Sequence, residues 1–218
     1  MTVIQCEIKF TSFWFIGTGK ESGTYADSLM LKDLNGLPYV PGKTIKGVFR
    51  EASRIALKNG WFKDVNLPDC WGSVIHFLFG REGSSFQNKN NTVDELTTEG
   101  FLNFTSAELP RQEREEIINN DKSQNNRISS LLYRILTNTK VDRKTGTAQK
   151  GSLRTIEVAV PVSLKFEISY NEKKLDQVIP EDKLISLLDH MAALIMEIGG
   201  KRRRGFGRCI IKVGGNAK

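Results

Sequence analysis

Histidine and cysteine are scarce in this 218-residue chain, which has two histidines and three cysteines. The scarcity of histidine disfavours a hydrolase that relies on a Ser-His or Cys-His pair. Because Cys6, Cys70 and Cys209 form no CxxC pair and no zinc-ligand spacing, we expect structural thiols in a reduced, cytoplasmic protein. The best apolar run, 184–198, carries charged residues and is therefore no membrane span, and the N-terminus shows no signal-peptide pattern.

Positive charge is in clear excess, with a net charge of +7 and an isoelectric point of about 9.3. A basic chain of this size favours a polyanionic partner, although charge alone says nothing about the fold. A hydrophobic content of 39% and three tryptophans are compatible with a packed core. We expect one domain over residues 1–218.

The segment Gly42–Thr44 reads GKT at the start of a predicted helix, which is how a nucleotide-binding P-loop ends. The spacing disfavours that interpretation, because five residues rather than four separate Gly36 from Gly42. Two of the five, Pro38 and Pro41, have no N–H to offer a phosphate. An ATP- or GTP-binding enzyme is therefore the weakest interpretation of this motif.

Apolar residues at helical spacing predict a helix over Thr44–Lys58, and its basic residues recur every fourth position. A helix N-terminus attracts phosphate through its dipole and its free N–H groups. The alternative is an ordinary capped helix with a basic surface. We predict contacts to a nucleic-acid backbone from Lys43, Thr44, Lys46 and Arg50.

Near the C-terminus, Arg204–Gly207 matches the first half of the RNA-binding signature of the RRM, while the residues that follow do not. Arginines suit bidentate phosphate contacts, glycines allow close backbone approach, and Phe206 could stack on a base. A glycine-rich turn with a solvated charge run is the alternative. The predicted RNA-binding residues here are Lys201, Arg202, Arg203, Arg204, Gly205 and Phe206.

A second basic piece, Thr137–Arg154, has five basic residues against one aspartate and a turn signal at its centre. We predict a protruding hairpin that extends to residue 157. Its basic residues include Lys140, Arg143, Lys150 and Arg154.

The order of predicted elements favours an α+β fold, a modified ferredoxin-like (RRM-like) palm with the protruding hairpin and insertions. Strict alternation predicts a single strand over Glu157–Tyr170. The polar stretch 109–130 is expected to be a surface insertion. The remaining elements are a strand or two over 3–16, a loop over 17–35, an apolar segment 74–79, a strand at 101–108, a helix over 181–198, and a loop and strand over 199–213.

These motifs, taken in order, resemble the RAMP superfamily of CRISPR effector proteins. "DSLMLKDLNGLPYVPGKTIKGVFR" is similar to the N-terminal motif of that superfamily, and "IGGKRRRGFGRCIIKV" is similar to its C-terminal glycine-rich loop. The middle of the chain also resembles the backbone subunit of type III complexes, the Cas-seven family in its Csm-three and Cmr-four forms. The chain departs from the pattern at Lys43, where the family has serine, and in the stretch 109–130.

The resemblance implies that the hairpin is a thumb that inserts between the bases of a guide–target duplex, with Lys140, Arg143, Lys150 and Arg154 as its RNA-binding residues. Copies of the chain would stack along a CRISPR RNA with other effector subunits, and without a membrane partner. The aspartate at the position of Asp27 would cleave the paired target RNA, assisted by a divalent metal ion such as Mg²⁺ or Mn²⁺ that Asp27 could hold.

The residues themselves leave other functions open. A single carboxylate can serve as a base toward the 2′-OH of RNA or hold a metal ion, but Asp27 could equally be a turn residue. Asp33 is the competing carboxylate, and its surroundings predict a turn. A non-catalytic guide-binding or capping subunit is the main alternative function. A stand-alone CRISPR RNA-processing nuclease commonly needs a histidine in a polar loop, and neither His76 nor His190 is in one.

Overall fold

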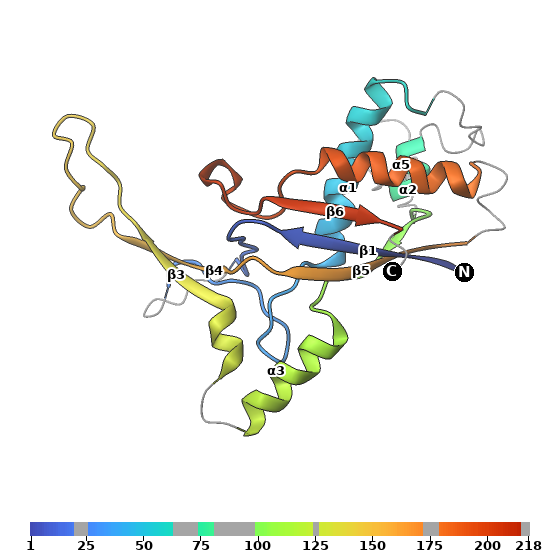
Figure 1. Ribbon diagram of the computed structural model, residues 1–218. Helices are drawn as coiled ribbons and strands as arrows, with labels where there is room; N and C mark the ends of the chain where they lie inside the picture. The colour runs from blue at the N-terminus through green and yellow to red at the C-terminus, as the bar shows by residue number, and fades with distance from the viewer. Residues whose placement is uncertain (20–25, 63–73, 81–98, 124–126, 172–178, 215–218) are drawn as a thin grey trace, which may run out of the picture.

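The computed structural model describes residues 1–19, 26–62, 74–80, 99–123, 127–171 and 179–214 (Figure 1). The expectation for Cys70 lies outside these residues. A four-stranded antiparallel sheet has the order β2-β5-β1-β6, formed by Asn103–Phe104, Ser163–Tyr170, Thr2–Phe10 and Cys209–Val213. Helices α1 (Gly42–Lys58) and α5 (Glu181–Leu194) connect these strands in the β-α-β-β-α-β order of the ferredoxin-like motif, which confirms the predicted fold class.

The core forms between the apolar residues at every second position of the strands and the apolar stripe of α1. In β1 every second residue is buried, from Ile4 to Phe10, while the residues between them face solvent or lie at the margin. Phe49 of α1 packs against Phe166 of β5, with ring centroids 6.5 Å apart. One face of the sheet is therefore the palm core and the other is open. In the part of the chain that the structure describes, no helix is long and apolar enough to span a bilayer.

Both predicted helices exist with shifted ends. Helix α1 begins at Gly42, two residues before the predicted start, with Pro41 as its N-cap. Helix α5 ends at Leu194 and not at 198, because the backbone beyond it turns to pair with the C-terminal loop. The Ile198 amide donates to Gly207 O at 2.9 Å, and Glu197 forms a bridge with Arg208.

The prediction of one continuous strand over Glu157–Tyr170 is wrong. The segment divides into β4 (Arg154–Ala159) and β5, which belong to different sheets. Pro161 lies at the break, and a proline has no N–H for a ladder hydrogen bond. The apolar alternation continues through the break, which is why the pattern alone did not show it.

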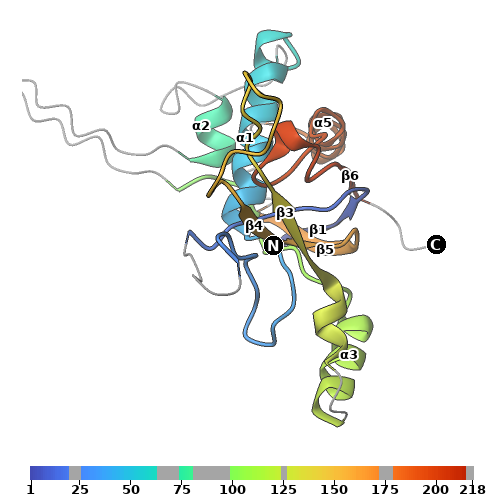
Figure 2. The same cartoon turned by 90° about the vertical axis from the view of Figure 1, so that its left-hand side faces the viewer.

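A hairpin inserted between β2 and β5 forms the second sheet, with β3 (Tyr133–Asn138) antiparallel to β4. Residues 139–151 are exposed throughout, and the hairpin stands away from the palm (Figure 1); Figure 2 views it from its tip, in front of α1. The predicted protruding hairpin is confirmed as a structure. Its base is buried, with Ile156, Val158 and Ala159 in the core.

The stretch 109–130 is more regular than expected. It contains helix α3 (Arg111–Ser123), which buries no residue, and leads into the 3₁₀ helix η2 (Ile128–Leu132). The apolar segment Val74–Phe79 is helix α2, and the predicted strand 101–108 is reduced to β2 and isolated bridges at Ala107 and Glu108.

Candidate nucleic-acid interface

The segment Phe13–Phe15 joins two of the predicted binding regions. Trp14 exchanges backbone hydrogen bonds with Ala159 of β4, at 3.1 and 2.9 Å. The carbonyls of Phe13 and Phe15 point the other way and accept from Gly207 and Gly200 of the C-terminal loop, at 2.8 and 2.7 Å. The hairpin base and the basic C-terminal loop are therefore fixed on opposite sides of one short segment.

The C-terminal loop needs glycine at two close approaches. A Cβ at Gly207 would lie 2.1 Å from Ile198 O, and one at Gly199 would lie 2.4 Å from Phe15 O. Lys201 has a φ of 61°, the only positive φ of a non-glycine residue in the described ranges. A lysine in the left-handed region is uncommon and costs about 1 kcal/mol or more, and such strain concentrates at functional sites.

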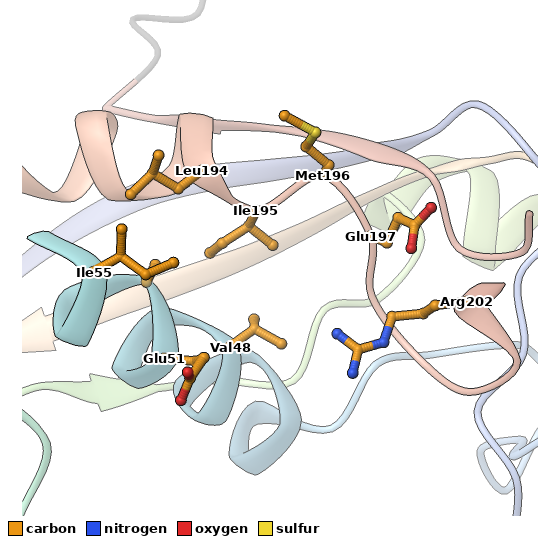
Figure 3. A pocket seen from close by; sticks show the side chains of 9 residues that line it. Val48, Glu51, Ile55, Leu194, Ile195, Met196, Glu197 and Arg202 are labelled. Carbon is orange, nitrogen blue, oxygen red and sulfur yellow. The ribbon is translucent and has the colours of Figure 1, made fainter.

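The predicted cations of this loop, Lys201–Arg204, are all exposed and form a short 3₁₀ turn that ends at Gly205. Phe206 is half-buried and packs against the core, so much of its ring is already covered. Arg202 borders a groove of about 460 Å³ between α1 and residues 194–197, and its guanidinium points toward α1 (Figure 3). The loop thus places its cations between the hairpin side and α1.

The hairpin presents its cations on an ordered turn. Asp142 accepts from the backbone amides of Lys144 and Gly146, at 2.8 Å each, through its side chain and its carbonyl respectively. Lys140 and Gln149 are joined across the turn by a 2.7 Å backbone hydrogen bond. Lys140, Arg143 and Lys150 are exposed around this turn.

The N-terminus of α1 is covered by neighbouring backbone. The Gly42 amide donates to Ser106 Oγ at 3.3 Å, and a Cβ at Gly42 would lie 2.2 Å from Phe104 O. Contacts from this end of α1 to a phosphate would therefore rely on side chains, chiefly that of Lys43, which is exposed, rather than on a cradle of free amides. Thr44 is half-buried in the first turn.

Further along α1, Lys46 and Arg50 are half-buried neighbours. Partial burial lowers the pKa of Lys46 below its ordinary value, an effect that Glu99 opposes and Arg50 strengthens. The Nε of Arg50 is buried and has no hydrogen-bond partner among the described residues. An anion bound beside these two adjacent, half-buried cations would offset their mutual repulsion.

Asp27 is held at the base of the hairpin. Its Oδ2 accepts from the Thr155 amide at 2.6 Å and from the Thr155 hydroxyl at 3.2 Å. Its Oδ1 lies 3.6 Å from Arg154 Nη1, and the Asp27 side chain is 39% exposed. The Thr155 amide is the main reason that the pKa of the Asp27 carboxyl lies below its ordinary value; desolvation opposes this, and the Thr155 hydroxyl and Arg154 add to it. Asp27 is therefore ionised at neutral pH and accessible from solvent.

Asp33 has the structural role that its surroundings predict. Its Oδ1 accepts from the amides of Asn35 and Leu37 at 2.8 Å each, and its Oδ2 pairs with Arg114 Nη2 at 2.7 Å. The Asp33 side chain is only 15% exposed. Both carboxylate oxygens of Asp33 are occupied by partners within the protein, so Asp33 is a poor candidate for chemistry on a bound molecule.

Of the cysteines, Cys6 and Cys209 are buried, as expected for structural thiols. Burial raises the pKa of Cys6 and of Cys209 to about 12, so neither thiol ionises at neutral pH. His190 is exposed and contacts the edge of Trp61. His76 is half-buried in α2.

The described residues contain no group of three histidine, cysteine, aspartate or glutamate side chains that could hold a metal ion. Beyond Asp27, a divalent ion at this place would take its ligands from outside the described residues, for example from RNA phosphates and water. Mg²⁺ commonly binds in this way, through one or two carboxylates together with phosphate oxygens and water. One ionised, partly exposed carboxylate fits that mode of binding.

Thr155, Glu157 and Lys32 surround the candidate carboxylate, and sequence reasoning did not single them out. Thr155 and Glu157 lie on β4 and contact the Asp27 loop, about 125 positions away in sequence. The available signal was three polar residues, Arg154, Thr155 and Glu157, in a strand whose other three residues are apolar.

These features define a ferredoxin-like protein with a basic projecting hairpin and an accessible carboxylate at its base. The family model of the RAMP superfamily matches residues 7–210, and the chain belongs to this superfamily. This confirms the family predicted from the order of the motifs.

Two solved structures show the same fold. A chain in the cryo-EM structure of the Type III-B Cmr-beta bound to cognate target RNA superposes with a TM-score of 0.59 at 10% identity, covering 98% of this chain and 97% of that chain. A chain in the apo-state structure of Cmr-beta gives 0.55 at 11% identity, covering 97% and 96%. A comparison with curated proteins gives no match.

Proposed function

We propose that the chain is a CRISPR RNA-binding backbone subunit of a type III effector complex, and that it cleaves complementary target RNA as an endoribonuclease. One observation carries the proposal: in a RAMP-superfamily chain, an ionised, partly exposed carboxylate lies at the base of a projecting basic hairpin. The fold likeness to a chain of a complex bound to target RNA supports it.

Guide binding would use the exposed cations of the C-terminal loop together with Lys43 on α1. The loop is preorganised by its glycine approaches, so little entropy is lost when its arginines contact phosphates. Arginine can bind a phosphate in a bidentate manner, whereas Lys43 would act as a point charge. The hairpin cations Lys140, Arg143 and Lys150 would contact the paired target, in the role of a thumb.

In the proposed cleavage, the 2′-oxygen of the target RNA would attack the adjacent phosphorus and displace the 5′-oxygen, giving a 2′,3′-cyclic phosphate and a 5′-OH. The 2′-OH proton would pass to water, and the leaving 5′-oxygen would take a proton from water. Because the pKa of Asp27 is lowered, this carboxylate is a weak base at neutral pH and is better suited to binding a cation than to abstracting a proton. A bound Mg²⁺ or Mn²⁺ would stabilise the charge that develops on the phosphate. Thr155 orients the Asp27 carboxylate and leaves Oδ1 facing solvent and Arg154.

The experiment is target cleavage by the assembled complex, with wild-type chain and with Asp27→Ala, with and without EDTA. The proposal expects RNA of defined length to co-purify with both proteins and cleavage to be lost only in the variant and in EDTA. If neither protein carries RNA, the backbone role is wrong.

A non-catalytic guide-binding or capping subunit is the second candidate. Asp27 accepts a hydrogen bond from Thr155 and lies near Arg154, and a purely structural aspartate would make the same contacts. Full cleavage by Asp27→Ala, or loss of RNA binding by that variant, would favour this second function.

A further inference from the structure

A buried carboxylate fastens the Asp27 loop to the hairpin. The Glu157 side chain, on β4, is only 1% exposed, and an ionised carboxylate is costly to bury unless it is paired and hydrogen-bonded. Its Oε1 lies 2.8 Å from Lys32 Nζ, and its Oε2 accepts from the Met30 amide at 3.2 Å. Both partners belong to the loop that carries Asp27.

The loop follows β4 along three successive residues. Thr155 and Glu157, two apart on the strand, project to the same side, and Thr155 holds Asp27 while Glu157 holds Met30 and Lys32. Between them, Ser28 pairs with β4 in a parallel bridge: its amide donates to Thr155 O at 3.3 Å and its carbonyl accepts from the Glu157 amide at 2.9 Å.

The other strand of the hairpin also contacts this loop. Lys32 Nζ lies 4.0 Å from the centroid of the Tyr133 ring on β3, a cation–π contact. The Tyr133 hydroxyl donates to Gly36 O at 2.7 Å. Lys32 is thus held between a carboxylate of β4 and an aromatic ring of β3, so the loop is tied to both strands of the hairpin.

We infer that Lys32 and Glu157 are positioning residues, which fix Asp27 relative to the hairpin so that the hairpin's placement on a target RNA sets which phosphodiester Asp27 reaches. This inference rests on the proposed cleavage function. Displacement of a catalytic carboxylate by about 1 Å can slow the reaction by roughly 100-fold. Lys32 and Glu157 would therefore affect cleavage without contacting RNA themselves.

The test compares Glu157→Gln, Lys32→Met and the double variant in assembled complexes. Glutamine keeps an acceptor for the Met30 amide but removes the ion pair. Three quantities are measured: the single-turnover cleavage rate, the cut positions at nucleotide resolution, and guide-RNA affinity. Glu51→Gln is the matched control, since it removes the acid of an exposed ion pair with Arg54 on α1.

Each single variant should lower the cleavage rate by about 10- to 100-fold and spread the cuts to neighbouring phosphodiesters, with guide affinity changed less than about twofold. The double variant should be no slower than the slower single variant, because both remove one interaction. Lys32→Arg, which keeps the charge, should retain wild-type cut positions. Glu51→Gln should behave as wild type.

Wild-type rates and cut positions in Lys32→Met would overturn the inference, and so would effects that multiply in the double variant. Because Lys32 is about one-third exposed (35%), Lys32→Met carries the test even if Glu157→Gln does not fold. Failure of the inference is distinguishable from failure of the proposed function: in the first case Asp27→Ala is inactive and Lys32→Met is normal, and in the second Asp27→Ala itself cleaves.

Discussion

The two sheets of this chain use their side chains in opposite ways. The four-stranded palm sheet buries every second residue of β1, β5 and β6 beneath its helices. The two-stranded hairpin buries residues only at its base and exposes the whole of 139–151. Stability should therefore concentrate in the palm, and effects on RNA should concentrate in the hairpin and its base. The following changes test that division, in order of decreasing loss of folding stability.

The largest loss of stability is expected in the palm core. Phe166→Ala removes a ring that is 2% exposed and packs against Phe49, and it should lower the free energy of unfolding by about 3–5 kcal/mol. Lys165→Ala, its exposed neighbour on the open face, is the control and should change it by less than about 0.5 kcal/mol. Denaturant unfolding measures both, and equal losses would refute the proposed distribution of stability.

A smaller loss is expected at the Asp33 turn. Asp33→Ala removes the acceptor of two backbone amides and the partner of Arg114, and it should cost about 1.5–3 kcal/mol. Its effect on the cleavage rate of the folded complex should be slight. A fall in cleavage without loss of stability would show that Asp33, rather than Asp27, is the reacting carboxylate.

The hairpin tip should matter little for folding. Replacing Asp142–Gly151 with a short Gly-Ser bridge removes exposed residues only and should shift the free energy of unfolding by less than about 1 kcal/mol. The same deletion should disrupt the regular spacing of cuts on a target RNA. A large loss of stability would mean that the tip packs against the palm.

The smallest effect on folding is expected for exposed cations of the C-terminal loop. Replacing Arg203 and Arg204 by alanine should leave stability within about 0.5 kcal/mol. It should flatten the salt dependence of guide-RNA binding by roughly 0.7 in the log–log slope for each phosphate that is no longer neutralised. An unchanged slope, measured by titration at several salt concentrations, would remove this loop from the RNA path.

Local patterns were enough to predict the palm. Helical spacing identified α1, and the turn signal at the centre of Thr137–Arg154 identified the hairpin. Asp33 was correctly predicted to be a turn residue because its amide partners, Asn35 and Leu37, lie within four positions. Helix α3 was missed because it buries no residue and so has no apolar stripe to detect.

Pairings between distant segments could not be predicted. The hydrogen bond from Thr155 to Asp27 and the pair of Lys32 with Glu157 join residues more than 120 positions apart. The structure likewise fixes Asp27 to β4, a contact that no local pattern indicated. Such pairings depend on the tertiary arrangement, which a single sequence does not encode as a local pattern.

The most direct measurement is the single-turnover target-cleavage rate of complexes that carry Asp27→Asn or Asp33→Asn, determined side by side with their unfolding midpoints. Asparagine keeps the shape of each side chain and an acceptor for the neighbouring amides but removes the charge. We predict at least about a 100-fold loss of cleavage for Asp27→Asn with little change in its unfolding midpoint, and near-normal cleavage with a lowered midpoint for Asp33→Asn. Wild-type cleavage by Asp27→Asn would contradict the account.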